Sequence, residues 1–249
     1  MGADTPVSVE LNLPQAVLLL ATNDTDGRPE VPVFALRTAV AGAVLAELHL
    51  LGAVELQGKH VRATGRVPMT DFQHELEVIR DKSRPHTPKR WVAMFEGRAQ
   101  VQRVYEGMAS LGILEPIGEG RAGRFRARRY AEKDHAPRAA LLNEIEQALG
   151  GTPSPAVASD SSGVGAEAGM GAGAGATEAH TADHGKAAAA QARVTALIAL
   201  LEASGLLARL LPAADKTWAD EIAKDYWPAR AVEDELRLIR IAEEEAPTL

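Results

Sequence analysis

The segment from Gly150 to Ala190 limits what this chain of 249 residues can fold into more than any other feature. It holds 9 of the 22 glycines together with 13 alanines, and Met170 is almost its only bulky side chain. Such a composition buries too little apolar surface to offset the conformational entropy of the chain, so we predict a disordered linker. The 149 residues before it and the 59 after it then form one large domain or one domain with a long insertion.

Composition excludes several classes of protein. The chain has no cysteine, which excludes a disulfide scaffold, a thiolate metal site and a cysteine nucleophile. The longest strongly apolar run, Ala16 to Ala21, is far shorter than the roughly 20 residues that a membrane span needs. Residues 1–9 show no basic region followed by an apolar one, and we expect a flexible N-terminus. These features together predict a soluble, cytoplasmic protein.

Charge is distributed unevenly along the chain. The net charge is −7, which argues against a general nucleic-acid binder. From Arg80 to Arg138, however, 14 basic residues face 7 acidic ones, while the remainder of the chain carries 13 basic and 27 acidic residues. This pattern is typical of a protein that meets an anionic partner on one face, and a charged solvated surface is the alternative.

Apolar periodicity predicts a mainly α-helical, compact multi-helix fold with two small β-hairpins. The first hairpin, Ala53–Leu56 with His60–Thr64, directly follows a helix over 38–51 that Gly52 ends. The second, Ile113–Ile117 with Arg124–Tyr130, follows a helix over 101–111 in the same way. Further helices are predicted over 11–21, 71–81, from 91, from 137, 192–204, 206–211 and 229–244. A helix followed by a hairpin is also the pattern of a winged helix.

No motif in the sequence predicts catalysis, a cofactor or a metal site. Gly118 to Gly123 matches G-x-G-x-x-G, but an alternating Arg/Phe/Arg strand follows it where a dinucleotide site needs a helix. His74-Glu75 lacks the second histidine of a zinc helix, because Val78 stands there. His180 and His184 have i, i+4 spacing but lie in the Gly/Ala-rich segment, without a scaffold to hold a metal.

The basic residues are better candidates for a binding site. Arg124, Arg126 and Arg128 alternate, so a strand presents all three on one face. That strand is either a phosphate-binding surface or an edge strand charged against aggregation. The segment Lys82 to Arg90 lies just before Trp91, which is either a membrane-interface aromatic or a core aromatic.

Several segments, taken in order, resemble the bacterial branch of the Golgi phosphoprotein 3-like domain family. They are LNLPQAVLLLATNDTDGRPE from Leu11, AVAGAVLAELHLLGAVEL, VQRVYEGMASLGILE with its arginine-rich hairpin, APRAALLNEIEQALGG and RVTALIALLEASGLLARLL. The resemblance implies a mainly helical, non-enzymatic domain over 10–249, interrupted by the disordered insertion at 150–190. It also implies a peripheral adaptor that binds phosphatidylinositol 4-phosphate and retains membrane-protein clients.

The resemblance carries over the family's head-group site only in part. A family arginine falls on Ala41, before Gly42, and in place of the family tryptophan this chain has only Phe34. A second arginine of the family falls on Arg138. Arg37 lies one helical turn before Ala41 and is a candidate substitute.

Our hypothesis is therefore a cytoplasmic, non-catalytic adaptor, peripheral to the inner face of a membrane and bound to anionic phospholipid. The predicted lipid-binding residues are Arg37, Arg90, Trp91, Arg124, Arg126, Arg128 and Arg138. The alternative is a DNA-binding regulator of winged-helix type. Against it, the helix over 101–111 offers only Arg103 as a basic residue, so we expect no nucleic-acid partner.

Overall fold

The computed structural model of the protein describes residues 10–117, 129–150, 176–214 and 216–245. In these ranges the chain forms ten helices and two separate antiparallel hairpins, which confirms the predicted mainly α-helical fold. The helices are α1 (Leu13–Leu20), α2 (Val33–Leu50), α3 (Gln73–Asp81), α4 (Pro88–Phe95), α5 (Arg98–Ser110), α6 (Ala136–Gly150), α7 (Ala176–Ala203), α8 (Leu207–Leu210), α9 (Thr217–Asp225) and α10 (Trp227–Glu245). The strands are β1 (Val54–Gln57), β2 (His60–Ala63), β3 (Leu114–Ile117) and β4 (Arg129–Glu132).

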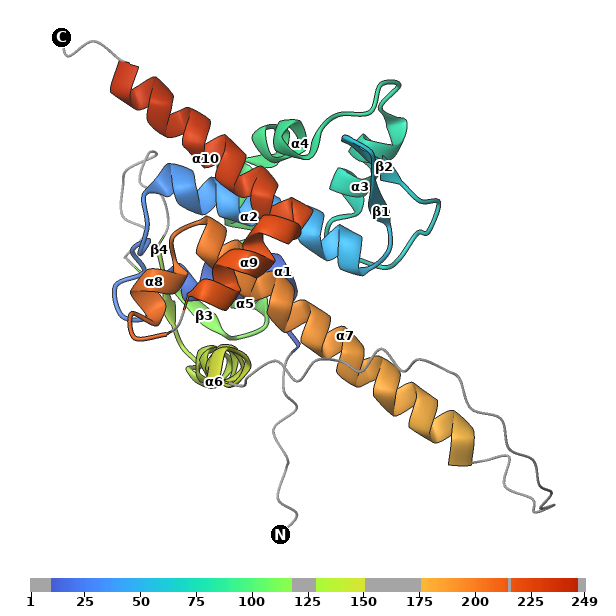
Figure 1. Cartoon of the computed structure of the whole chain (residues 1–249). Helices are drawn as coiled ribbons and strands as arrows, with labels where there is room; N and C mark the ends of the chain where they lie inside the picture. The colour runs from blue at the N-terminus through green and yellow to red at the C-terminus, as the bar shows by residue number, and fades with distance from the viewer. Residues whose placement is uncertain (1–9, 118–128, 151–175, 215, 246–249) are drawn as a thin grey trace, which may run out of the picture.

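Helix α2 is the central helix of the fold, with α1, α4, α7 and α10 packed around it (Figure 1). From Ala35 to Leu48 every side chain except that of Arg37 is buried. By length and composition α2 is apolar enough to cross a membrane, but 72% of it is buried inside the protein. Because its apolar side chains pack against neighbouring helices, α2 is a core helix.

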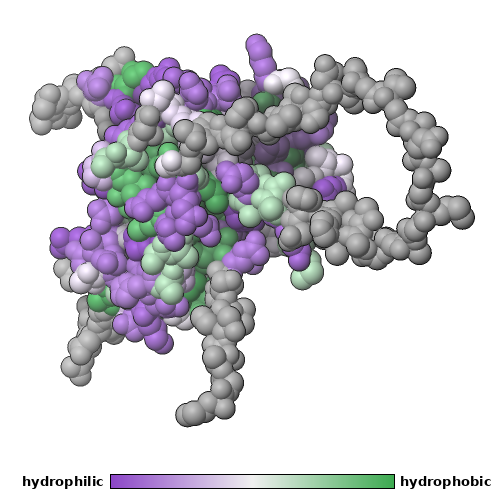
Figure 2. Space-filling model, turned by 60° about the horizontal axis from the view of Figure 1, so that its bottom comes forward, coloured by the Kyte–Doolittle hydropathy of each residue, from purple (hydrophilic) through white to green (hydrophobic). Residues whose placement is uncertain are grey.

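On the face of the molecule shown in Figure 2, hydrophobic side chains form only small patches between hydrophilic ones.

Helix α1 is buried along its whole length, and its first turn is capped by its own side chains. The Asn12 carboxamide oxygen accepts a hydrogen bond from the backbone N–H of Gln15 at 3.0 Å, and the Gln15 side chain accepts one from the Asn12 N–H at 3.1 Å. Pro14, in the same turn, has no N–H that needs a partner. The helix therefore begins where the sequence has a capping box.

A buried carboxylate joins α1 and α2 to α7, which lies beyond the Gly/Ala-rich segment. Glu47 of α2 receives both ends of the Arg193 guanidinium, at 3.0 and 3.1 Å, and the backbone N–H of Leu13 at 2.8 Å. The main cluster of buried apolar side chains likewise extends from Leu11 to Leu236. We propose on this basis that the chain forms one domain with an insertion.

Helix α7 begins at Ala176, well before the start at Ala192 that the sequence predicted. The prediction that residues 176–190 are disordered is therefore wrong, while residues 151–175 lie outside the described ranges. From 176 to 190 the sequence has a single glycine, Gly185, and many alanines, which have the highest helix propensity. These turns extend a helix whose second half is held in the core, and the first half projects away from it (Figure 1).

The two helix–hairpin units predicted from the sequence are present, and their local structures match. Of the return strand predicted over Arg124–Tyr130, the structure describes Arg129 and Tyr130, and the strand continues to Glu132. After α2, Gly52 has a φ of 66° and the N–H of Ala53 bonds to the Leu48 carbonyl at 2.9 Å. After α5, Gly112 has a φ of 76° and the N–H of Ile113 bonds to the Met108 carbonyl at 3.1 Å. A glycine is favoured at both places because L side chains rarely adopt positive φ.

The strand registers and one additional helix complete the fold. Strands β1 and β2 pair from Val54 with Ala63 to Gln57 with His60, and β3 and β4 from Leu114 with Glu132 to Ile117 with Arg129. Helix α9, which the sequence analysis did not predict, packs against α7 and α10. It spans only 9 residues, too few for a clear apolar period between Pro212 and Pro228.

Replacing Gly42 by alanine is expected to destabilise the contact between α2 and α10. A Cβ at this position would lie 2.1 Å from a methyl carbon of Val232, whose branched side chain has little rotamer freedom. Overpacking costs about 1–3 kcal/mol, and the better helix propensity of alanine returns about 1 kcal/mol. Urea denaturation of Gly42→Ala should therefore show an unfolding free energy lower by up to about 2 kcal/mol.

The double variant Gly42→Ala/Val232→Ala is the control for this contact. Because Val232→Ala makes room for the new methyl group, the double variant should be more stable than the sum of the two single effects predicts. Strict additivity would mean that the two side chains do not meet.

Glu202 of α7 is expected to make stability depend on pH. Burial, and then the nearby Asp220 carboxylate, raise the pKa of Glu202 above its ordinary value, while Lys216 lowers it. A raised pKa in the folded state means that the protonated form stabilises the fold at acid pH, and that this contribution is lost as pH rises. Glu202→Gln should therefore raise the Tm at pH 7, with a difference that shrinks toward pH 4.

The exposed Glu221 of α9 provides a control with the same change of charge. Differential scanning calorimetry of Glu221→Gln should show a smaller gain at pH 7 than Glu202→Gln. Equal gains from both variants would assign the effect to net charge rather than to the Glu202 environment.

Candidate functional site

The predicted lipid-binding residues are distributed over α2, α4, α6 and a segment that the structure does not describe. Arg124, Arg126 and Arg128 belong to that segment, residues 118–128, and their alternation stays a sequence prediction. The other four predicted residues can be placed. Arg37 lies on α2, Arg90 and Trp91 on α4, and Arg138 on α6.

Helix α4 presents basic and apolar groups on its outer side. Its N-cap is Thr87, whose hydroxyl accepts the N–H of Arg90 at 3.4 Å, and Pro88 follows in the first turn. Arg90 is exposed, and Met94, one turn later on the same side, is 37% exposed. The loop before the helix adds the exposed Lys82 and Arg84. The positive charge of this segment therefore lies at the surface.

Trp91 lies on the inner side of α4 and is fully buried. Its ring centroid is 5.3 Å from that of His86 and 5.5 Å from that of Phe95. Of the two interpretations of Trp91, the structure supports a core aromatic, and the burial contradicts a side chain that enters the membrane interface. Neighbouring helix positions face in different directions, which is why Arg90 is exposed where Trp91 is not.

An acidic side chain, that of Glu235, lies close to the basic residues in the first turn of α4. Burial, and then the charge of Glu96, raise the pKa of Glu235 on α10, whereas Lys89 and Arg90 lower it. Glu96 itself accepts a hydrogen bond from the Thr38 hydroxyl of α2 at 2.9 Å. The same bond places the end of α4 next to the first half of α2, which carries Arg37.

Arg37 is half-buried on α2, and Val33, one turn earlier, is 49% exposed. Ala41, one turn later, is fully buried, so a long cationic side chain has no room at the position that matches the family arginine. Arg37 and Arg90 thus lie on two helices in contact with each other.

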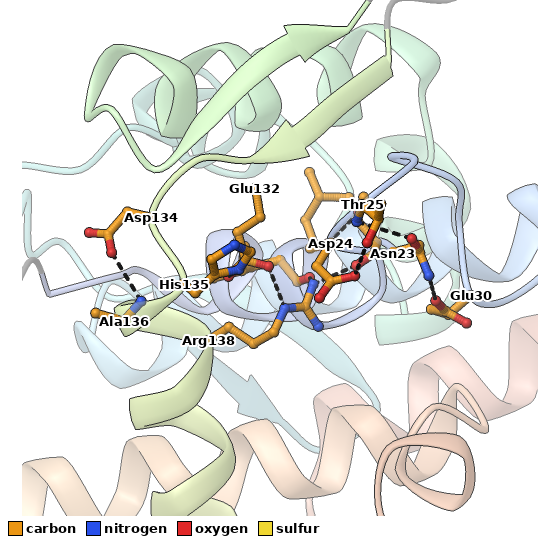
Figure 3. A network of polar contacts seen from close by, with 12 residues as sticks. Asn23, Asp24, Thr25, Glu30, Glu132, Asp134, His135, Ala136 and Arg138 are labelled. Atoms are coloured by element: carbon orange, nitrogen blue, oxygen red, sulfur yellow. Dashed lines mark hydrogen bonds and ion pairs between the residues drawn. The ribbon is translucent and has the colours of Figure 1, made fainter.

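Arg138 holds three segments of the protein together. Its Nε donates to Glu132 of β4 at 2.6 Å, and its Nη2 donates to the carbonyl of Leu19 at 2.5 Å and to that of Thr22 (Figure 3). The Arg138 side chain is 15% exposed and that of Glu132 only 1%. These contacts favour a structural role for the guanidinium of Arg138 over one in binding lipid.

The structure separates Arg138 from the basic segment of α4. Helix α4 contacts α2 and α10, whereas α6 contacts α1 and α7, and Figure 1 shows α4 and α6 on opposite sides of the fold. Arg37 and Arg90 are therefore brought to neighbouring helices, and Arg138 is not part of that surface.

A polar cavity of about 360 Å³ lies between α1, α3 and α5, away from the predicted residues. Arg103 of α5 lines it and binds both Glu75 and Gln100. Arg103 is the basic residue that a winged-helix interpretation needed for DNA. The Arg103 guanidinium already binds Glu75 and Gln100, which argues against a DNA-binding winged helix.

The sequence analysis did not identify Glu132 as an important residue. Its partner Arg138 also binds the carbonyls of Leu19 and Thr22, which lie more than a hundred residues away in the chain. A single glutamate at the end of a short strand gives no pattern in the sequence.

Comparison with known families gives one match, to the model described as Golgi phosphoprotein 3 (GPP34), over residues 13–239. The matched range includes α1 and most of α10, and therefore nearly the whole fold. No individual curated protein matches the chain.

Replacing Arg138 by methionine is expected to destabilise the protein strongly, because the buried Glu132 carboxylate then loses its cation. Breaking one half of a buried ion pair costs about 3–5 kcal/mol. Chemical denaturation of Arg138→Met should show a loss of this size, and the double variant Glu132→Gln/Arg138→Met should recover part of it. Arg129→Met, at an exposed position of β4, should change stability by less than about 0.5 kcal/mol. Equal losses at Arg138 and Arg129 would contradict the structural role.

Proposed function

The chain belongs to the Golgi phosphoprotein 3 (GPP34) family, and from this we propose that it is a peripheral membrane adaptor that binds anionic lipid. The family is one of non-enzymatic adaptors, cytoplasmic and peripheral to Golgi membranes. At that level the match supports an adaptor function for this chain. Lipid binding, the lipid head group and a membrane-protein client are the parts that we add as a proposal.

The exposed basic segment of α4 is the observation that carries this proposal. Lys82, Arg84 and Arg90 are exposed together with the flexible thioether side chain of Met94. Each basic side chain near an anionic membrane contributes about 1 kcal/mol, and guanidinium groups bind phosphate oxygens in pairs. An exposed methionine among such groups provides a small apolar contact with the interface.

The neighbouring part of α2 supports the same surface. Arg37 lies on the helix that α4 contacts, and Val33 exposes apolar area one turn before it. We name the surface made by Val33, Arg37, Arg84, Arg90 and Met94 the α2/α4 surface. Because Ala41 is buried, this surface lacks one arginine that the family resemblance would place there, and we propose general recognition of anionic lipid over strict selection of phosphatidylinositol 4-phosphate.

Acidic neighbours are expected to make this binding weak and sensitive to salt. Glu235 lies near Lys89 and Arg90 and offsets part of their positive charge. Attraction between exposed charges is screened over about 8–10 Å at physiological ionic strength. We therefore expect binding to require a membrane rich in anionic lipid rather than a single head group.

The test is cosedimentation with vesicles of phosphatidylcholine alone, with phosphatidylserine, and with phosphatidylinositol 4-phosphate. The wild-type protein should bind both anionic vesicles, and less as salt rises. Arg84→Glu/Arg90→Glu should lower the apparent affinity by about tenfold or more, because two basic groups are lost and two repulsive ones are added.

A matched control places the same change of charge elsewhere. Lys186→Glu/Lys224→Glu alters two exposed lysines of α7 and α9, outside the α2/α4 surface, and should retain most of the binding. Equal losses in both double variants would reject the α2/α4 surface. Failure of the wild-type protein to bind any anionic vesicle at low salt would reject lipid binding itself.

A further inference from the structure

We propose that Asp24, Glu132 and His135 form a binding site for a divalent transition-metal ion of the zinc type. The three residues come from the loop after α1, from the end of β4 and from the position before α6, and Figure 3 shows them around the Arg138 contact. Each offers one ligand atom, and these atoms lie within 4.8 Å of one another. The proposal is independent of the lipid-binding surface.

The backbone brings these three residues together before any metal binds. The N–H of Glu132 donates to the carbonyl of Asp24 at 2.9 Å, which joins β4 to the loop after α1. In that loop the Asn23 side chain accepts the N–H groups of Thr25 and Asp26, both at 3.1 Å. The loop is therefore fixed on both sides of Asp24.

Close packing of this loop against β4 requires a glycine. Gly27 has a φ of 64°, and a Cβ there would lie 2.5 Å from the carbonyl oxygen of Tyr130. His135 is fixed from the other side, because its carbonyl accepts the N–H of Ala139 in the first turn of α6 at 3.1 Å. The positions of the three ligand residues are thus set by main-chain contacts, and only their side chains need to adjust.

An unpaired oxygen of Glu132 points independently to a cation. The Glu132 side chain is 1% exposed, and its Oε2 accepts the hydrogen bond from Arg138. Its Oε1 is buried and has no hydrogen-bond partner among the described residues; Nδ1 of His135 lies 3.6 Å from it. A buried carboxylate oxygen without a partner is costly, and a bound ion or water is the usual reason that it persists.

The donor set favours zinc over magnesium or calcium. One imidazole nitrogen and two carboxylate oxygens are ligands that zinc accepts, whereas magnesium and calcium prefer oxygen alone. A tetrahedral zinc ion holds its ligands about 3.3 Å apart, so the side chains must close by roughly 1 Å. Asp24 and His135 are exposed and have the freedom to do this. Two carboxylates against the single guanidinium of Arg138 leave an excess of negative charge for the ion.

The test is calorimetric titration with zinc chloride alone. The parent protein for all arms should carry His180→Ala and His184→Ala, so that this i, i+4 pair contributes no zinc binding of its own. This parent should bind one zinc ion per chain, and its Tm should rise with zinc. His135→Ala and Asp24→Asn, which change exposed side chains and leave the Glu132–Arg138 pair intact, should each weaken binding by about tenfold or more.

His74→Ala is the matched control, since His74 is exposed on α3 and belongs to no such cluster. It should bind zinc as the parent does. The proposal is overturned if the parent binds no zinc, or if His135→Ala and His74→Ala bind it equally. In that case a bound water satisfies the Glu132 oxygen.

Discussion

The pairing of Glu47 with Arg193 is the constraint on which the arrangement of the helices depends. Glu47 is 4% exposed on the central helix, and an ionised carboxylate at such a depth is strongly unfavourable unless it is paired. Arg193 and the N–H of Leu13 satisfy both of its oxygens. Since Arg193 belongs to α7, that helix must dock where its guanidinium reaches α2. The position of α7 then determines where α9 and α10 pack, because both helices contact α7.

A second buried glutamate is paired with an arginine at the other end of α1. There the buried Glu132 is paired with Arg138, which also binds the carbonyls of Leu19 and Thr22. In both places an arginine from a later helix reaches a buried glutamate and the main chain next to α1. Guanidinium groups suit this because their planar donors meet a carboxylate and carbonyl oxygens together. Arginine in this protein thus does structural work in the interior, as well as supplying charge to the surface of α4.

Because some arginines are buried in structural contacts and others are exposed, the structure brings together only part of the predicted site. Nothing in the sequence distinguishes the six predicted arginines from one another, and three of them can be placed in the structure. Arg90 is exposed on α4 and Arg37 lies on the adjoining α2, whereas Arg138 is used inside the fold. Trp91 follows Arg90 directly, yet faces the core, because successive residues of a helix point in directions about 100° apart. Asp24, Glu132 and His135 could not be found from spacing, since the chain brings them together only through the loop contact with β4.

The sequence by itself determined the local structure. Apolar periodicity and the glycines at 52 and 112 act over a few residues, and the helices and hairpins that they predicted are present. The tertiary structure alone decided which charged residues are buried and which helices meet. Those outcomes depend on contacts between residues such as Glu47 and Arg193, 146 positions apart in the chain. Such pairing offsets the cost of removing a charge from water, and no local pattern in the sequence records where that burial happens.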